Sequence, residues 1–482
     1  MKSVTTARVI GLLTGPALCL IICLLPGDLV SPVADKVLGV AAWIVSWWIT
    51  EAVSISVTAL LPLLLFPLLG ISTMRDVSVH YGDPVIFLFF GGFIIALAME
   101  KVHLHKRIAL SIIRLTGTSP NRVILGFMIA TGLLSMWISN TATTLVMLPI
   151  AVSVIDLLRN DGDGFTNGDR NFALSIMLGI AYSANIGGVA TLIGTPPNMV
   201  MAGFINQQYE TSISFFRWMM LGIPFAIIMT AILYVVMVKW MYPNHLGHDA
   251  EAGKLVIRQE LQKLGSWSPD EKRVMGVFLF AILLWTIREP MSKQFSWFTL
   301  SDTGVAMLAA LLIFALPTDL KNMKFVLDWS DTKTLPWGIL ILFGGGLALA
   351  DGMSDAGLID EIGNFVHTLN NWPLWVISGF LILVVLFMTE LMSNVALVTI
   401  FLPVAAGIAS GLGIPFQHLL IPITMAASCA FMLPMATPPN AIVFASGHVK
   451  VRQMVRIGVV LNLISVLLLA VLAATLIPYL FG

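Results

Sequence analysis

The octapeptide WISNTATT at Trp137–Thr144 places five hydroxyl or amide side chains in the middle of an apolar run. A second stretch, TELMSNVALVT at Thr389–Thr399, repeats the pattern later in the chain. Polar side chains are costly in hydrocarbon unless they are hydrogen-bonded or bind something. The two stretches therefore predict a binding site buried in a membrane protein.

The composition supports this prediction. Of 482 residues, 58% are hydrophobic and 11% are charged, and the mean hydropathy is +0.93. Soluble domains carry about 25% charged residues, so we expect the chain to be surrounded by membrane lipid. The 26 basic and 26 acidic residues balance, which indicates no nucleic-acid partner. The three cysteines lie in apolar segments and suggest neither a disulfide framework nor a metal cluster.

Apolar runs of about 20 residues are long enough to cross a bilayer as helices. We predict eleven crossings, with the first at the N-terminus rather than a removable signal peptide, because no cleavage site is evident. They lie at 8–25, 37–50, 53–70, 84–100, 172–203, 216–240, 273–288, 302–317, 336–350, 418–446 and 456–480. The stretches 122–158 and 373–410 are too long for one crossing and carry Ser-Asn in the middle. Each is therefore predicted to be a re-entrant helical hairpin.

The sequence contains one unit twice. FFGGFIIALAME at Phe89–Glu100 returns as LFGGGLALADGM at Leu342–Met353, 253 residues later. SNTATTLVMLPIAV and SNVALVTIFLPVAA are 254 residues apart, and the TPPN sequences within TLIGTPPNMVMAG and PMATPPNAIVFAS are 242 apart. The smaller last offset reflects an extra loop at 159–170 in the first unit. Three motifs in one order at nearly constant spacing indicate a duplication.

The two units are predicted to have opposite orientations in the membrane. Lys101, Lys106 and Arg107 follow the first FFGG segment, whereas DGMSDAGLIDEIG after the second has no basic residue. Lys and Arg favour the cytoplasmic face. Inverted repeats are typical of secondary transporters, which bind their cargo near the midplane. The predicted fold class is an all-α polytopic membrane protein with about eleven transmembrane helices and two re-entrant hairpins in two inverted repeats.

These features divide the chain into five regions. They are N-terminal scaffold helices (1–83), a first repeat with a cytoplasmic-side hairpin (84–240), a cytoplasmic connector (241–273), linking scaffold helices (274–335), and a second repeat with an external-side hairpin (336–482). Since Lys2 and Arg8 favour the inside, eleven crossings place the N-terminus in the cytoplasm and the C-terminus outside. A bacterial inner membrane is the expected location.

Two Thr-Pro-Pro-Asn sequences, Thr195–Asn198 and Thr437–Asn440, are predicted to break helices inside the membrane. Consecutive prolines remove two N–H donors and exclude the preceding residue from helical geometry. We expect Gly187, Gly188 and Gly194 to loosen the first break further. Carbonyl groups freed by a break, with Ser, Thr and Asn oxygens, suit a small hard cation such as sodium. Helix N-termini and Asn amides suit a carboxylate.

Basic side chains are missing around these motifs. The sequence has no Lys or Arg between Arg122 and Arg159, between Arg170 and Arg217, or between Lys333 and Lys450. A bound dicarboxylate would therefore need co-bound cations to offset its charge, unless a distant Arg folds in.

Two polar features also have an alternative interpretation. Ser135 and Ser139 have the spacing of residues that pack helices together, but two Ser-Asn motifs, each followed by a Pro-Pro break, favour a binding site. Glu390 is either a proton carrier or a buried anchor, and we favour the anchor.

The motifs SMWISNTATT, IGGVATLIGTPPN, LFGGGLALA, TELMSNVA and CAFMLPMATPPNAIVF resemble those of the divalent anion/sodium symporter family over essentially the whole chain. This family includes bacterial dicarboxylate transporters and mammalian sodium–dicarboxylate and sodium–citrate carriers. The resemblance implies a homodimer in which a transport region slides past a scaffold region by an elevator motion.

The resemblance also implies two sodium sites and one substrate site. The first sodium site would comprise Ser135, Ser139, Asn140 and the backbone of Gly194. The second would comprise Thr389, Asn394 and the backbones of Met392 and Ala436. The substrate carboxylates would lie between the hairpin tips, at Asn140, Thr141, Thr195, Asn394, Val395, Thr437 and Pro438.

Val395 departs from the family pattern, because many dicarboxylate carriers have a second Ser-Asn-Thr. Its methyl replaces a hydroxyl donor, worth about 0.5–1.5 kcal/mol if the bond is made, and resembles the citrate-preferring branch. We expect sodium-coupled import of succinate, malate and fumarate, with citrate close behind. A sodium-independent dicarboxylate exchanger is the alternative. A membrane-embedded enzyme is disfavoured, because Glu390 has no evident His or Cys partner inside the membrane.

Overall fold

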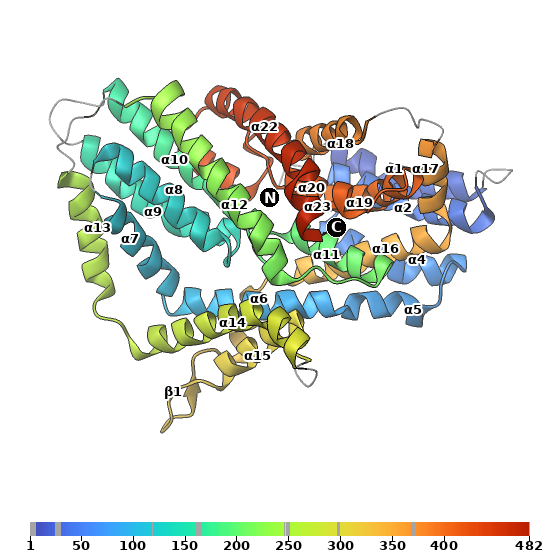
Figure 1. Ribbon diagram of the computed structural model, residues 1–482, viewed down its shortest axis with the longest axis horizontal. Coiled ribbons are helices and arrows are strands. Elements are labelled where there is room, and N and C mark those ends of the chain that lie inside the picture. The colour runs from blue at the N-terminus through green and yellow to red at the C-terminus, as the bar shows by residue number, and fades with distance from the viewer. Residues whose placement is uncertain are drawn as a thin grey trace.

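The chain folds almost entirely into helices, as Figure 1 shows. The computed structural model describes residues 6–24, 30–117, 119–159, 166–244, 246, 251–295, 299–367 and 373–481. Within these ranges, 8 helical segments are long and apolar enough to cross a membrane, and shorter apolar helices accompany them. A membrane-spanning, all-helical architecture is therefore confirmed, while the number of crossings stays a prediction.

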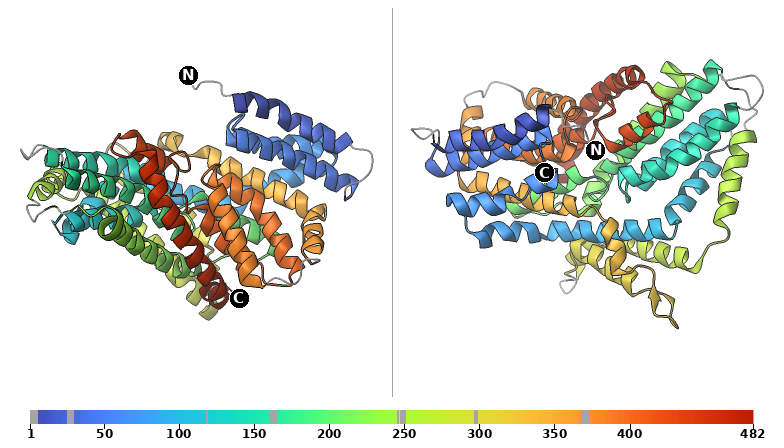
Figure 2. Two further views of the ribbon diagram at one scale, coloured as in Figure 1. Left: turned by 90° about the horizontal axis from the view of Figure 1, so that it is seen from above. Right: turned by 180° about the vertical axis from the view of Figure 1, so that it is seen from behind.

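The N-terminal region packs along one end of the molecule, where Figure 2 shows α1 and α2 side by side. Its elements are α1 (Thr6–Leu24), α2 (Pro32–Thr50), α3 (Ile55–Thr58), α4 (Leu61–Leu69), α5 (Met74–Val79) and η1 (His80–Gly82). Helix α2 begins earlier than predicted, because the Ser31 hydroxyl accepts a hydrogen bond from the Ala34 N–H. The predicted span 53–70 is wrong as a single helix. It is interrupted between α3 and α4, where Pro62 lies in the first turn of α4.

The described part of the first repeat contains seven helices, and the FFGG, Ser-Asn and Thr-Pro-Pro-Asn motifs lie along them in sequence order. They are α6 (Pro84–Lys101), α7 (Leu104–Thr116), α8 (Pro120–Ser135), α9 (Asn140–Arg159), α10 (Asn167–Val189), α11 (Pro196–Tyr209) and α12 (Phe215–Tyr234), the last continuing as the π-helix η2 (Val235–Met241). The apolar stretch 122–158 is thus two helices joined at WISN. The segment 172–203 is a broken pair, α10 and α11, as the Thr-Pro-Pro-Asn sequence predicts.

The second repeat contains the same series of helices. They are α16 (Trp337–Asp355), α17 (Leu358–His367), α18 (Leu374–Met388), α19 (Asn394–Gly411), α20 (Gln417–Ala427), α21 (Pro438–Ala445) and α22 (Val451–Ala474), followed by α23 (Leu476–Phe481). Helices α8 and α18, and α9 and α19, begin 254 residues apart, and α11 and α21 begin 242 apart. The duplicated sequence unit is therefore a duplicated structural unit. In Figure 1 helices α7, α8 and α9 of the first unit and α17 and α19 of the second lie toward opposite ends of the molecule.

The segment between the repeats is partly polar. It contains α13 (Glu251–Leu264), α14 (Pro269–Gln294), α15 (Asp302–Ala315), the antiparallel pair β1 (Pro317–Asp319) and β2 (Lys324–Phe325), and the 3-10 helix η3 (Trp329–Thr334). Helix α13 lies in the predicted connector and packs on α7 and α9. Hydrogen bonds from Lys263 and Lys106 lower the pKa of Glu260, whose carboxylate lies 3.0 Å from the Lys106 amine.

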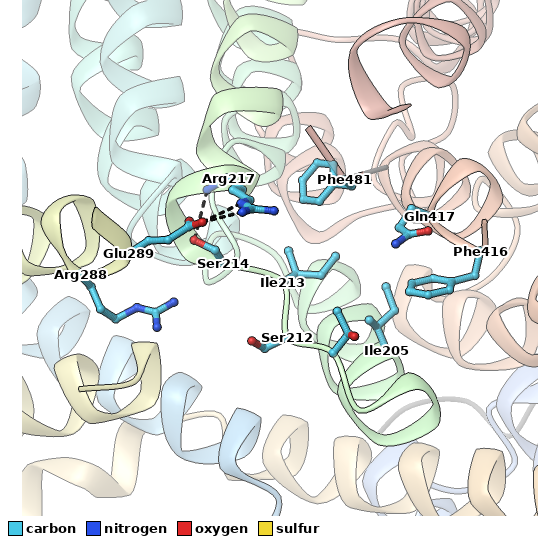
Figure 3. A pocket seen from close by; sticks show the side chains of 11 residues that line it. Ile205, Ser212, Ile213, Ser214, Arg217, Arg288, Glu289, Phe416, Gln417 and Phe481 are labelled. Carbon is cyan, nitrogen blue, oxygen red and sulfur yellow. Dashed lines mark hydrogen bonds and ion pairs between the residues drawn. The ribbon is translucent and has the colours of Figure 1, made fainter. Parts of the chain in front are cut away.

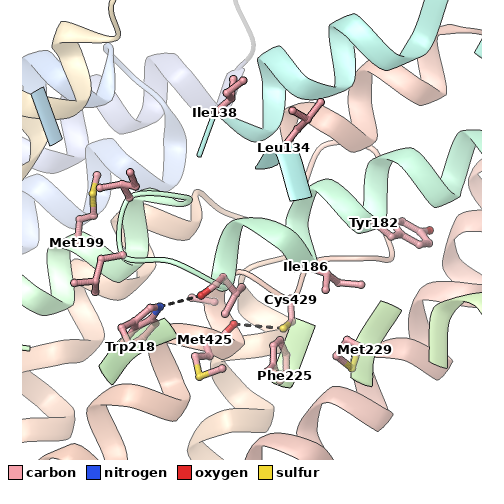
Figure 4. Packing of buried hydrophobic residues seen from close by; sticks show 14 of the residues in the cluster. Leu134, Ile138, Tyr182, Ile186, Met199, Trp218, Phe225, Met229, Met425 and Cys429 are labelled. Carbon is pink, nitrogen blue, oxygen red and sulfur yellow. Dashed lines mark hydrogen bonds between the residues drawn. The ribbon is translucent and has the colours of Figure 1, made fainter. Parts of the chain in front are cut away.

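Aromatic packing fixes the first hairpin against the core. The Trp137 ring at the hairpin tip lies 5.0 Å from Phe278 and 6.2 Å from Phe215, and Phe215 stacks on Trp285 at 4.3 Å. In Figure 4 Trp218 of α12 directs its ring N–H toward the first break, where it donates to the Val189 carbonyl at 2.9 Å. The hairpin tip and the break are thus both held by α12.

Candidate functional site

The first hairpin turns on a pair of hydrogen-bonded side chains. Helix α8 ends at Ser135 and α9 begins at Asn140, and the Ser135 hydroxyl donates to Asn140 Oδ1 at 2.5 Å. The Ser139 hydroxyl accepts from the Ala142 N–H at 3.2 Å, which satisfies one donor in the first turn of α9. Since Asn140 Oδ1 is an acceptor here, its amide hydrogens remain donors toward an anion.

The second hairpin repeats this arrangement. The Thr389 hydroxyl lies 2.6 Å from Asn394 Oδ1 and 2.6 Å from the Ala427 carbonyl oxygen. A hydroxyl has one proton and cannot donate fully to both oxygens. The cluster therefore holds more acceptors than protons, which is the composition that a bound cation requires.

The first break is organised by Asn198. Thr195 is in extended conformation at the N-cap of α11, followed by Pro196 and Pro197. The buried Asn198 amide donates to the carbonyls of Thr191 at 2.8 Å and Val189 at 3.3 Å. The amide thus satisfies backbone acceptors that the helix break exposes.

The second break is organised in the same way. The Asn440 amide donates to the carbonyls of Ala430 and Leu433, both at 3.1 Å. The Thr437 hydroxyl oxygen accepts from the Asn440 N–H at 3.4 Å and from Asn185 Nδ2 at 3.1 Å. Because both bonds use its lone pairs, the Thr437 O–H can donate to a carboxylate.

Close backbone approaches join the first hairpin to the first break. A Cβ at Gly188 would lie 2.6 Å from Asn140 Oδ1, and a Cβ at Gly194 would meet the Gly188 carbonyl oxygen. A Cβ at Gly187 would meet the Gly132 carbonyl oxygen. The expectation that Gly187 and Gly188 loosen the break is wrong: both lie in the last turn of α10 and allow α8 and α9 to pack closely on it.

The two halves meet at these motifs. Helix α9 packs on α21, and α11 packs on α19, so each hairpin arm contacts the break helix of the other repeat. Asn185 of α10 adds a direct bond to Thr437 across the halves. The predicted residues Thr141, Met392 and Val395 are half-buried at the tips, Gly194, Thr195 and Ala436 are buried at the breaks, and Pro438 is exposed.

Three side chains with clear structural roles had no role in the sequence interpretation. Asn185 and Thr191 lie in and after α10, and Asn198 lies within a recognised motif, yet only their partners reveal what they do. The one signal in the sequence is the amide of Asn185 in an otherwise apolar helix, because a buried amide needs hydrogen-bond partners.

Basic residues are engaged elsewhere. Arg217 pairs with Glu289 at 2.6 Å, Arg288 pairs with Asp302 at 2.7 Å, and the buried Arg107 pairs with Glu271 at 2.6 Å. Among the described residues, none of the ion pairs joins a Lys or Arg to a predicted site residue. None of the predicted site residues is itself charged, so a site without local basic charge stays a prediction.

Two cavities lie near the site without containing its predicted residues. One of about 270 Å³, shown in Figure 3, lies between Arg217, Arg288 and Gln417. Another of about 480 Å³ is lined by the face of α9 that begins at Ala142, two residues after Asn140, and by His103 and Lys106 opposite. The second cavity extends along α9 from Ala142 to Ser153.

Replacing Gly188 by Ala should separate the hairpin tip from the break. The added methyl would overlap the Asn140 amide, so we expect the Ser135–Asn140 pair to shift and ligand affinity to fall about tenfold or more. Sodium and succinate titrations of purified protein would measure this. Gly276→Ala is the control, because a Cβ there meets nothing within 4 Å. Equal affinities in the two variants would contradict the proposed contact.

Paired broken helices, buried oxygen clusters and a duplicated unit define an integral membrane transport protein rather than a receptor domain or a soluble enzyme. The chain belongs to the family described as the sodium:sulfate symporter transmembrane region, whose model matches residues 6–482. The family resemblance predicted from the motifs is confirmed. It is a family of transporters and not of enzymes.

Curated relatives match along the whole chain. The sodium-dependent dicarboxylate transporter SdcS of Staphylococcus saprophyticus is 40% identical over 491 residues, which covers 100% of this chain and 93% of that protein. SdcS of Staphylococcus aureus is likewise 40% identical, over 497 residues with the same coverage. The matched length includes both hairpins and both breaks.

Solved structures with a similar fold include two transporters. The YdaH transporter of Alcanivorax borkumensis aligns with a TM-score of 0.61 over 98% of each chain, at 12% identity. MtrF of Neisseria gonorrhoeae aligns with a TM-score of 0.56 over 83% of each chain, at 12% identity. At this identity the likeness concerns the fold alone.

Proposed function

We propose that this protein is a sodium-coupled symporter that imports C4-dicarboxylates such as succinate, malate and fumarate. The observation that carries the proposal is the matched pair of oxygen clusters, Ser135–Asn140 and Thr389–Asn394, each beside a Thr-Pro-Pro-Asn break. The SdcS relatives, named as sodium-dependent dicarboxylate transporters, support the same ion and substrate class.

The chemistry of the site follows from these groups. Hydroxyl, amide and carbonyl oxygens at each tip bind one sodium ion, with Ser139, Gly194, Met392 and Ala436 completing the two sets. The carboxylates of the substrate lie between the tips, where Asn140, Asn394 and Thr437 donate and Thr141, Thr195, Val395 and Pro438 shape the pocket. Helices α9, α11, α19 and α21 begin at these motifs, and the dipole at a helix N-terminus favours an anion. The motif segments themselves carry no Lys or Arg, so the cations supply the charge that makes anion binding favourable.

Alternating access is proposed to follow the family pattern. The re-entrant hairpins, the elevator motion of a transport region against a scaffold, the homodimer and the cytoplasmic N-terminus are all parts of this proposal. The contacts of α9 with α21 and of α11 with α19 support it, because they place both half-sites in one packed unit that can move together.

Labelled succinate uptake into proteoliposomes tests the function. Sodium-driven uptake into empty vesicles, with no uptake in choline, supports symport. Uptake that requires internal dicarboxylate and is indifferent to sodium would show the alternative, an exchanger. Competition by unlabelled succinate and citrate ranks the substrates in the same vesicles.

Replacing Val395 by Thr should shift preference toward smaller dicarboxylates. Val395 follows Asn394 at the second tip and is half-buried, so the new hydroxyl can donate to a carboxylate. A hydrogen bond of about 1 kcal/mol predicts roughly a fivefold rise in the succinate-to-citrate ratio. Competition assays in vesicles measure the ratio. An unchanged ratio would remove Val395 from the specificity pocket.

A further inference from the structure

Each hairpin tip is hydrogen-bonded to the helix break next to it, but the groups that form this connection differ between the two halves. In the second half the carboxylate of Glu390, which is 2% exposed, makes this tie. Glu390 Oε1 accepts from the Phe431 N–H at 2.8 Å and the Met432 N–H at 2.9 Å, and Oε2 accepts from the Leu433 N–H at 3.0 Å. Three consecutive backbone donors thus form a cradle for one carboxylate.

A fourth donor comes from another helix. Asn462 of α22 donates its amide to Glu390 Oε1 at 2.8 Å. All four partners are N–H donors, and a protonated carboxyl group would instead need an acceptor for its own hydrogen. The geometry therefore fits the ionised form. Among the described residues no Lys, Arg or His forms an ion pair with it, so the negative charge is not neutralised by a side chain.

The first half makes the equivalent tie with neutral groups. Met136 occupies the position 254 residues before Glu390, and its backbone carbonyl accepts from the Thr191 hydroxyl at 2.5 Å. Thr191 lies 242 residues before Leu433, one of the residues that binds Glu390. The two repeats therefore join the same positions, once through a charge and once without one.

Glu390 and its cradle are adjacent in sequence to residues of the proposed second ion site. Glu390 directly follows Thr389, and the cradle residue Leu433 is three residues from Ala436. We propose that Glu390 is a positioning residue that also gives the second site a fixed negative charge absent from the first. The second site then binds sodium more tightly and is filled first. This inference rests on the proposed sodium-coupled function and adds an order of binding to it.

Sodium titration of thermal stability tests the charge. The purified full chain is titrated with sodium at constant ionic strength, with choline as replacement and without dicarboxylate. Ligand binding raises the Tm by mass action. With Glu390→Gln, the sodium concentration that gives half the rise should increase about tenfold or more, as expected for removing a buried charge near a cation.

Two matched variants separate charge from anchoring. Asn462→Leu removes one hydrogen bond but keeps the carboxylate, so the Tm without sodium should fall while the sodium midpoint stays within about threefold. The double variant Glu390→Gln with Asn462→Asp returns a carboxylate one hydrogen bond away, and the midpoint should recover. Equal increases of the midpoint in Glu390→Gln and Asn462→Leu would overturn the proposal and leave a purely structural anchor.

The outcomes distinguish this inference from the proposed function. If the unaltered chain shows neither a sodium-dependent Tm nor sodium-driven uptake, the proposed function fails. If it shows both and Glu390→Gln keeps the same midpoint, only the charge asymmetry fails. If Glu390→Gln does not fold, Glu390→Asp is titrated with sodium instead, because it keeps the negative charge. An increased sodium midpoint in Glu390→Asp would contradict an electrostatic role for Glu390.

Discussion

Asn140→Ala should reduce sodium-driven succinate uptake by at least about 100-fold. Asn140 begins α9, and its Oδ1 accepts from Ser135 while its amide faces the last turn of α10 at Gly188. The variant would therefore remove a proposed ion ligand and a proposed anion donor together. A hydrogen bond to a charged group contributes about 1.5–3 kcal/mol, so its loss together with the loss of a sodium ligand accounts for a decrease of this size.

A control variant on α9 separates an effect on the binding site from an effect on the stability of the helix. Ser153→Ala lies on the exposed face of the same helix and removes only an intrahelical bond to the Pro149 carbonyl, so uptake should stay within about twofold. Uptake by purified, folded Asn140→Ala in vesicles is the measurement. If this variant retained transport with normal sodium dependence, the first ion site would lie elsewhere.

Features with local determinants could be predicted from the sequence. Thr-Pro-Pro at Thr195 and Thr437 breaks a helix through its own missing N–H groups, and the structure begins α11 and α21 at the following prolines. The turn at Asn140 and the duplicated order of helices follow from motifs of the same kind. Such features need no information about what the segment packs against.

Features that depend on distant partners could not be predicted. Gly188 was expected to loosen a break, but its role is set by Asn140, which comes from a different helix. The bond from Asn185 to Thr437 joins residues 252 positions apart, and the Glu390 cradle uses backbone N–H groups that any sequence has. Such contacts cannot be inferred from composition or motif spacing, because the contacts form only when the helices pack.

Asn198→Ala should destabilise the protein by roughly 2–5 kcal/mol and abolish most uptake. The Asn198 side chain is fully buried, and its amide donates to the carbonyls of Thr191 and Val189. Each buried acceptor left unpaired costs about 1–3 kcal/mol. Thermal unfolding of the purified protein should show the loss as a fall in Tm, and uptake should fall with it because Thr195 and Gly194 lie in the same break.

The equivalence of the two repeats makes this prediction stronger. Asn440 donates to Ala430 and Leu433 as Asn198 does to its own break, so Asn440→Ala should lower the Tm by a similar amount. Asn322→Ala, in the exposed β1–β2 turn, should change stability by less than about 0.5 kcal/mol. If Asn198→Ala and Asn440→Ala changed the Tm as little as Asn322→Ala, the Thr-Pro-Pro sequences alone would maintain the helix breaks. The proline rings would then suffice, and the asparagines would be free to act on the ligand directly.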